Sequence, residues 1–191
     1  MRDMRRIPCV IARGGTSKGI YIKENHLPAD PAERDRTILA VFGSPDVRQI
    51  DGLGGADPLT SKLAIIGPSS RPDADVDYTF GQVSFKAPIV DYAGNCGNIS
   101  AGVGPFAIDE GLVKAVSPVT TVRIHNTNTG KVLVAEVPVE NGRAKVKGDY
   151  AIDGVPGTGA KQMLDFADTQ GAATGKLLPT RQTHEALKPA A

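Results

Sequence analysis

Apolar residues in this chain come in short runs that glycine and proline keep apart, a pattern typical of a fold built mostly from short strands. Runs rich in β-branched and aromatic residues predict strands. Residues 127–130, Thr-Asn-Thr-Gly, have the composition of a hairpin turn between two of them. The predicted strands are residues 7–12, 20–22, 63–66, 76–80, 82–85, 89–92, 120–126, 132–137 and 143–146.

Two segments have the features of helices. Asp30 followed by Pro31 marks a helix start, because an aspartate side chain caps the first turn and proline is tolerated at the first helical position. This predicts a helix over residues 32–42 that stops at Gly43. Residues 99–113 form the second predicted helix, and because they are apolar on nearly all sides we expect them to be buried all round.

The order of these elements favours one fold class. Gly102 and Gly104 lower the helix propensity of the second helix, which indicates that another element packs very closely against it. Residues 151–159 read as a loop, and residues 160–166 are compatible with a short helix. Many short strands and one wholly apolar helix predict an α+β fold, a mixed, mostly antiparallel, barrel-like sheet wrapped round a central apolar helix. Alternating βαβ units would require an amphipathic helix after each strand.

Composition and charge exclude several classes of protein. The 191 residues are enough for one ordinary domain or two small ones, and 23% charged residues are typical of a soluble globular chain. A net charge of +1 argues against nucleic acid or an anionic membrane as a partner. No run reaches the ~20 apolar residues of a membrane span, and no signal-peptide pattern is present. We therefore expect a cytoplasmic protein.

Cys96 is the first candidate for chemistry. It lies in Asn95-Cys96-Gly97-Asn98, a tight turn directly before the apolar helix. The start of a helix carries unpaired N–H donors and the positive end of the helix dipole, which favour a thiolate and can hold a carboxylate. This predicts proton transfer on an acidic small molecule. The alternative is an inert buried thiol, the commonest state of a free cysteine.

Lys62 is the second candidate, because it follows glycine-rich loops and opens the apolar run 63–66. A desolvated lysine can act as a base, whereas a solvated lysine beside an edge strand cannot. Gly14-Gly15-Thr16-Ser17 is suited to hold an anion, or forms only a hairpin loop; its spacing matches neither a dinucleotide fingerprint nor a phosphate loop. The aspartates, histidines and two cysteines show no metal-ligand spacing, so no metal or cofactor is predicted.

Taken together, these motifs resemble the PrpF family of methylaconitate and 4-oxalomesaconate isomerases or tautomerases. The resemblance extends from about residue 7 to residue 180. It rests on residues 13–19 (RGGTSKG), 43–46 (GSPD), 49–55 (QIDGLGG), 60–62 (TSK), 69–73 (SSRPD), 75–78 (DVDY) and 95–98 (NCGN).

The resemblance implies a diaminopimelate-epimerase-like fold of two similar domains, with the site in the cleft between them and with neither a metal nor an organic cofactor. It implies an unsaturated di- or tricarboxylate as substrate, and Lys62 and Cys96 as the catalytic residues. The substrate carboxylates would be bound by residues of three loops: Gly14, Gly15, Thr16, Ser17, Ser69, Ser70, Arg71, Gly97 and Asn98.

On this reading Lys62 acts as the base at one carbon of the substrate and Cys96 as the proton donor at another, although the sequence does not decide which residue takes the proton. Backbone donors and Arg71 would neutralise the carboxylates. Residues 51–57 with 59–62 look closer to the 4-oxalomesaconate branch, which serves the degradation of aromatic acids, than to the 2-methylaconitate branch of propionate breakdown.

Length is the main departure from the family, whose members are roughly twice as long. We expect residues 1–180 to form the first domain, residues 181–191 to be an atypical polar tail, and the second domain to be missing. Activity would then be weak unless another chain completes the cleft, and the exposed inter-domain face would favour a homo-oligomer. Two alternatives stay open: a silent half-domain that binds carboxylates or a partner chain, and a redox protein in which Cys9 meets Cys96.

Overall fold

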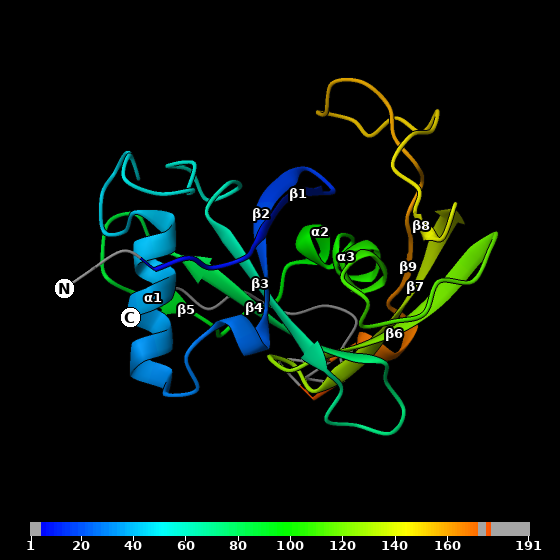
Figure 1. The fold of residues 1–191 in the computed structure, drawn as a ribbon, viewed down its shortest axis with the longest axis horizontal. Coiled ribbons are helices and arrows are strands. Elements are labelled where there is room, and N and C mark those ends of the chain that lie inside the picture. Colours follow the sequence, from blue (N-terminus) through cyan, green and yellow to red (C-terminus); the bar gives the residue numbers. More distant parts are fainter. Residues whose placement is uncertain (1–4, 172–174, 177–191) are drawn as a thin grey trace, which may run out of the picture.

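A computed structural model of the chain describes residues 5–171 and 175–176 (Figure 1). The tail expected at residues 181–191 lies outside the described residues. Within them, nine strands form a curled sheet in the order β1-β2-β3-β4-β6-β7-β8, in which β5 pairs with β4 and β9 pairs with β7. The strands are β1 Val10–Gly14, β2 Ser17–Lys23, β3 Lys62–Pro68, β4 Val76–Val83, β5 Val90–Asp91, β6 Val119–Asn126, β7 Lys131–Glu140, β8 Arg143–Ala144 and β9 Met163–Asp165.

The helices are short and few in the described part of the chain. The predicted start of the first one is confirmed: Asp30 caps it by accepting a hydrogen bond from the Glu33 N–H at 2.8 Å, and Gly43 ends it in the left-handed conformation with φ 72°. No helix of the described residues is long and apolar enough to cross a membrane. The helices are α1 Pro31–Phe42, α2 Gly97–Ser100 and α3 Val103–Asp109, with the 3₁₀ turns η1 Glu24–His26 and η2 Ala167–Thr169.

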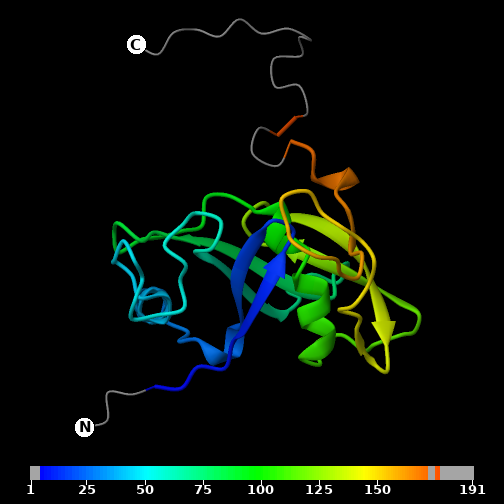
Figure 2. The ribbon, with the colours of Figure 1, turned by 90° about the horizontal axis from the view of Figure 1, so that it is seen from above.

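The sheet separates two hydrophobic cores. Figure 2 shows α2 and α3 inside the curl of the sheet, whereas α1 packs on the outer face. Side chains of β2 alternate between the cores, with Tyr21 facing α3 and Ile20 and Ile22 facing α1. The central strands are therefore buried on both faces, which explains the continuous apolar run at residues 63–66.

The predicted architecture is confirmed in its main features. The β2–β3 and β4–β6 pairs are parallel and the other paired strands are antiparallel, so the sheet is mixed and mostly antiparallel. The central helix is buried on nearly all sides, as its composition predicts. The chain is thus an α+β fold in which the sheet curls round an apolar helix.

Three predicted elements differ from the structure. The helix expected over 99–113 is two short helices, α2 and α3, and ends at Asp109. The strands expected at 76–80 and 82–85 are one strand, because Gly81 pairs with Leu63 and keeps the ladder continuous. Residues 160–166 contain no helix; strand β9 pairs with β7 there, a tertiary contact that local propensity does not reveal.

Candidate active site

The structure brings Lys62 and Cys96 together from elements that are 34 residues apart in sequence. Lys62 is the first residue of β3, and Cys96 is the N-cap residue of α2. The Nζ atom of Lys62 donates a hydrogen bond to the Sγ atom of Cys96 at 3.2 Å. Each residue is only 9% exposed, so the amine and the thiol meet largely out of contact with solvent, where their interaction is strong.

Glycine and an aromatic ring position this pair. Gly19 of β2 lies beside Lys62 in the parallel register, and a Cβ there would come within 2.8 Å of the Ile99 side chain. The missing side chain lets α2, and with it Cys96, approach the sheet. The Lys62 Nζ also lies 5.7 Å from the centre of the Phe80 ring, within the distance of a cation–π contact.

The first predicted anion-binding loop lies directly against the start of α2. Gly14 packs so closely on the Asn98 carbonyl that a Cβ would overlap it, and Gly15 takes a positive φ of 51° against the Asn98 side chain. The Asn98 Nδ2 donates to the Thr16 hydroxyl at 3.0 Å. The structure therefore joins this loop to Gly97 and Asn98, next to Cys96.

Ser17 has an unusual environment. The residue is 2% exposed, yet its hydroxyl has no hydrogen-bond partner among the described residues. Alternation along β2 places its side chain on the same face as Gly19 and Tyr21, toward α2. A buried hydroxyl without a partner costs free energy, which makes Ser17 a candidate to bind a ligand group.

The second predicted loop lies elsewhere. Ser69, Ser70 and Arg71 follow the far end of β3, and six residues of strand lie between Lys62 and Ser69, a span of about 23 Å. The Arg71 guanidinium is already occupied, since it binds Asp73 at 2.7 and 2.8 Å and the Gly130 carbonyl at 3.2 Å. The structure does not bring this loop to the pair, and its role in binding substrate stays a prediction.

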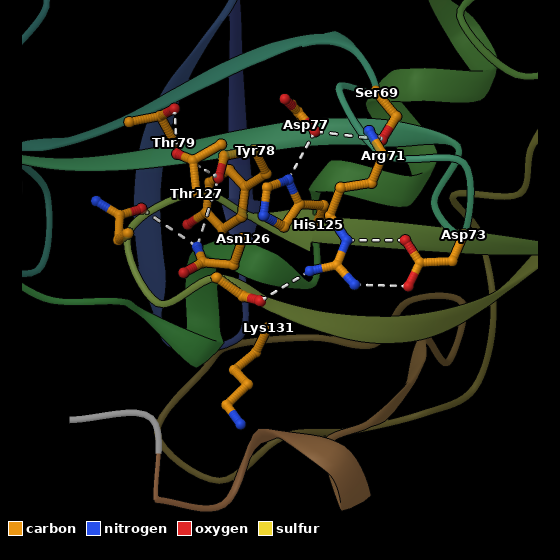
Figure 3. Close-up of polar contacts among 12 residues, drawn as sticks. Ser69, Arg71, Asp73, Asp77, Tyr78, Thr79, His125, Asn126, Thr127 and Lys131 are labelled. Carbon is orange, nitrogen blue, oxygen red and sulfur yellow. Dashed lines mark hydrogen bonds and ion pairs between the residues drawn. The ribbon is translucent and has the colours of Figure 1, made fainter. Parts of the chain in front are cut away.

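Asp77 lies at the centre of that distant cluster (Figure 3). Its Oδ1 accepts a hydrogen bond from the Ser69 hydroxyl at 3.2 Å and lies 2.8 Å from His125 Nδ1. Burial alone would raise the pKa of Asp77, but hydrogen bonds from Ser70 and His125 hold the pKa below its usual value. The cluster therefore ties the β3–β4 turn to β6.

Sequence reasoning missed several residues that shape the site. Asn95 Oδ1 accepts the Cys96 N–H at 2.7 Å and also the side-chain amide of Asn126 at 3.2 Å. In the sequence, Asn126 reads only as the end of a predicted strand and Asn128 only as a turn residue. Tyr21, whose hydroxyl donates to Ile99 O at 2.8 Å, read only as a strand residue.

The electrostatic environment of the pair extends to Tyr21. Burial raises the pKa of Tyr21 well above its usual value, and the nearby charge of Cys96 raises it further. A cavity of about 600 Å³ lies between β1, α3 and β8, but Lys62 and Cys96 do not line it. Within the described residues, no group of three or more His, Cys, Asp or Glu side chains is placed to hold a metal ion.

Comparison with known proteins identifies the family of the chain. The family model described as "PrpF protein" matches residues 4–191. The chain belongs to the PrpF family. It is 71% identical over 187 residues to the 3-methylitaconate isomerase of Eubacterium barkeri, a match that covers 98% of this chain and 49% of that protein. It is 56% identical to the 4-oxalomesaconate tautomerase of Pseudomonas putida KT2440, over 96% of this chain and 51% of the relative.

Solved structures support the fold. The crystal structure of a methylitaconate-delta-isomerase has 74% identity and a TM-score of 0.88, covering 90% of this PrpF chain and 76% of that one. A hydroxyproline epimerase from Agrobacterium vitis, at 16% identity, has a TM-score of 0.51 over 76% of this chain and 41% of its own. The diaminopimelate-epimerase-like fold is thus confirmed. The chain spans about half the length of the curated relatives it matches, 49% and 51% of the two named above.

Proposed function

We propose that this PrpF chain carries the proton-transfer residues of an isomerase that shifts a double bond in a small unsaturated polycarboxylate. The observation that supports this most directly is the buried contact of 3.2 Å between Lys62 Nζ and Cys96 Sγ. Moving a double bond by one position requires one group to remove a proton from carbon and another to return a proton to a different carbon. A buried amine–thiol pair offers both groups side by side.

We infer from this geometry that Cys96 is the base, a choice that the sequence left open. Lys62 donates to the sulfur and lies within cation–π distance of the Phe80 ring, so we assign the pair as a thiolate beside an ammonium. The thiolate would take the proton from the carbon next to a carboxylate. The C–H electron pair then becomes part of a conjugated dienolate, and its negative charge lies near the Lys62 ammonium.

The second step returns a proton and resets the pair. The Lys62 ammonium would protonate the far carbon of the dienolate, using the electron pair of the former double bond and leaving a neutral amine. The Cys96 thiol then passes its proton to that amine across the existing hydrogen bond. No atom is gained or lost, and neither step uses a metal or an organic cofactor.

The carboxylates of the substrate require their own donors. Thr16, Ser17 and the start of α2 at Gly97 and Asn98 lie on the same side of the sheet as the pair. The unpartnered Ser17 hydroxyl supports this assignment most directly. Binding at these donors would place a carboxylate beside the carbon that loses its proton, where negative charge develops.

The names of the relatives suggest three candidate substrates, which we rank by sequence identity. Identity is 71% to a protein named 3-methylitaconate isomerase, 56% to a 4-oxalomesaconate tautomerase and 47% to the 2-methyl-aconitate isomerase of Cupriavidus necator. All three names describe small unsaturated acids with two or more carboxyl groups. We therefore place 3-methylitaconate first, ahead of 4-oxalomesaconate, the substrate expected from the loop motifs, and of 2-methylaconitate.

The test follows each of the three acids by ultraviolet absorbance and by proton NMR in D₂O. We expect turnover by the intact chain, entry of solvent deuterium at the carbon that Lys62 protonates, and loss of turnover in Lys62→Ala and Cys96→Ala. Cys9→Ala and Lys86→Ala are matched controls that keep activity. A full-length relative in the same assay shows that the substrates are competent.

If the chain binds these acids by calorimetry but does not turn them over, it is a carboxylate-binding half whose catalysis needs the rest of the protein. Turnover that survives both Lys62→Ala and Cys96→Ala would show that the pair is not the proton-transfer site. Absence of both binding and turnover, with the relative active, would overturn the proposal for this chain.

A further inference from the structure

The turn between β6 and β7 makes an unusual set of side-chain contacts with the strand beside it. Asn126, the last residue of β6, is fully buried and lies beside Tyr78 of β4 in the parallel register (Figure 3). The next residue, Thr127, donates its N–H to the Tyr78 carbonyl at 2.9 Å, and its hydroxyl lies 2.6 Å from that of Thr79. The turn is therefore attached to β4 rather than free in solvent.

Asn128 extends this attachment to the ring under Lys62. Its side-chain carbonyl accepts the Phe80 N–H at 2.8 Å, and its amide donates to the Phe80 carbonyl at 2.9 Å. The same amide donates to the Tyr92 carbonyl at 2.8 Å. One side chain thus fixes the backbone of Phe80, whose ring contacts the Lys62 ammonium, and the segment that leads to Cys96.

Asn126 makes the corresponding contact on the cysteine side. Its Nδ2 donates to Asn95 Oδ1 at 3.2 Å, and that oxygen also accepts the N–H of Cys96 at 2.7 Å. Its own Oδ1 accepts the N–H and hydroxyl of Thr129 at 3.0 and 2.8 Å. A buried amide with both ends occupied has one favourable orientation, so it can fix the position of Asn95.

The Cys96 backbone depends on this contact for its orientation. As the N-cap residue of α2, Cys96 has no side-chain capping bond, and its sulfur instead meets Lys62. Its carbonyl accepts hydrogen bonds from the Ser100 N–H and hydroxyl, which fixes the peptide group that follows Cys96. The hydrogen bond from its N–H to the Asn95 side chain fixes the peptide group that precedes it.

We infer that Asn126 is a positioning residue that, through Asn95, aims the Cys96 thiol at Lys62, while Asn128 holds the Lys62 side through Phe80. The relevance to catalysis rests on the proposed function, but the positioning itself does not require turnover. A turn that contacts neither sulfur nor ammonium thereby sets the distance between them.

The experiment measures how fast iodoacetamide alkylates Cys96 as a function of pH, in a Cys9→Ser background so that one thiol reacts. In Asn126→Leu, which removes the amide without adding charge, we expect alkylation at neutral pH to slow by about tenfold and the pH profile to move to higher pH, because the thiolate loses its aligned ammonium. Asn95→Ala changes an exposed residue, so it keeps the test valid if Asn126→Leu does not fold.

Two comparisons separate positioning from loss of packing. Thr120→Val removes a different buried polar group of β6, a hydroxyl that bonds with the backbone of Val116, and should leave the alkylation profile unchanged. In a Lys62→Met background, Asn126→Leu and Asn95→Ala should have little further effect, because the interaction they align is gone.

Mere loosening of the structure would speed alkylation of a buried thiol rather than slow it. Faster or unchanged alkylation with an unmoved pH profile in Asn95→Ala, or an equal slowing in the Lys62→Met background, would overturn the inference. Because the readout is alkylation, a chain without isomerase activity can still support the inference, and the proposed function fails only on its own assay.

Discussion

The hydroxyl of Tyr21 lies against the backbone of Gly102, in the gap between α2 and α3. Tyr21 is fully buried, and its hydroxyl donates to the Ile99 carbonyl at 2.8 Å. A methyl group on Gly102 would overlap the phenol oxygen. The Tyr21 hydroxyl thus donates to a backbone carbonyl at the point where the predicted long helix is interrupted. This hydrogen bond connects α2 to β2.

Gly102→Ala should destabilise the protein. The new methyl group must push the Tyr21 ring out of a packed core, which costs about 1–3 kcal/mol of unfolding free energy. Chemical denaturation followed by circular dichroism measures the change. Gly94→Ala is the matched control, because a Cβ there meets no atom within 4 Å. Equal stability of the two variants would show that Tyr21 and Gly102 are not in close contact in solution.

Ser17→Ala should lower the affinity for a dicarboxylate without lowering the stability of the fold. The Ser17 hydroxyl has no partner among the described residues, so its removal should leave the unfolding free energy unchanged or slightly higher. Affinity for an unsaturated dicarboxylate should fall, by roughly tenfold if one hydrogen bond to a charged group is lost. Thermal unfolding and calorimetric titration measure the two effects.

Ser61→Ala is the control for Ser17→Ala, since Ser61 is equally buried but its hydroxyl donates to Val83 O and accepts from Gln49, both at 2.8 Å. It should lower the unfolding free energy by about 1–3 kcal/mol. A Ser17→Ala variant that loses stability in the same way, with unchanged affinity, would assign Ser17 a structural role.

Local patterns in the sequence predicted much of the fold because the information they carry is local. The capping aspartate and the apolar runs specify where α1 and the buried strands lie. Strand β9 was missed because its residues have weak propensity and are held by pairing with β7. The break at Gly102 was missed because it depends on Tyr21, which is far away in the chain.

In the candidate site, too, the sequence revealed the residues with local signals and missed those that depend on tertiary contacts. Lys62 and Cys96 stood out because of the loops and helix start that flank them, and the family resemblance joined them. Arg71 looked equally suitable to bind a carboxylate. Its salt bridge to Asp73 and its position beyond the end of β3 become visible only in the folded structure. Asn126 carried no signal beyond its place at the end of a predicted strand, since its partner Asn95 is 31 residues away.

Cys9 and Cys96 should not form a disulfide in the folded protein. Cys96 belongs to the core around α3, whereas Cys9 packs against the core that contains α1, on the other face of the sheet. A disulfide needs Cα atoms within about 7 Å, which a sheet between the two residues prevents. Treatment with diamide followed by mass spectrometry of the folded chain tests this. A Cys9–Cys96 crosslink formed without unfolding would revive the redox alternative.

Asp77→Asn should make stability less dependent on pH in the acid range. The pKa of Asp77 is lowered in the folded protein, so its ionised form stabilises the fold above the unfolded pKa of about 3.9, and this contribution is lost as pH falls through the folded pKa. At neutral pH the variant should lose about 1–2 kcal/mol of unfolding free energy, because it gives up a charged acceptor for Ser69 and His125.

Urea denaturation of wild type and variant from neutral to strongly acid pH measures this difference. The gap between the two proteins should close as Asp77 becomes protonated in the wild type. Asp51→Asn, a change on an exposed loop, should show no comparable gap at neutral pH. A gap that stays constant down to the lowest pH would mean that Asp77 stabilises the β3–β4 turn by shape and neutral hydrogen bonds rather than by its charge.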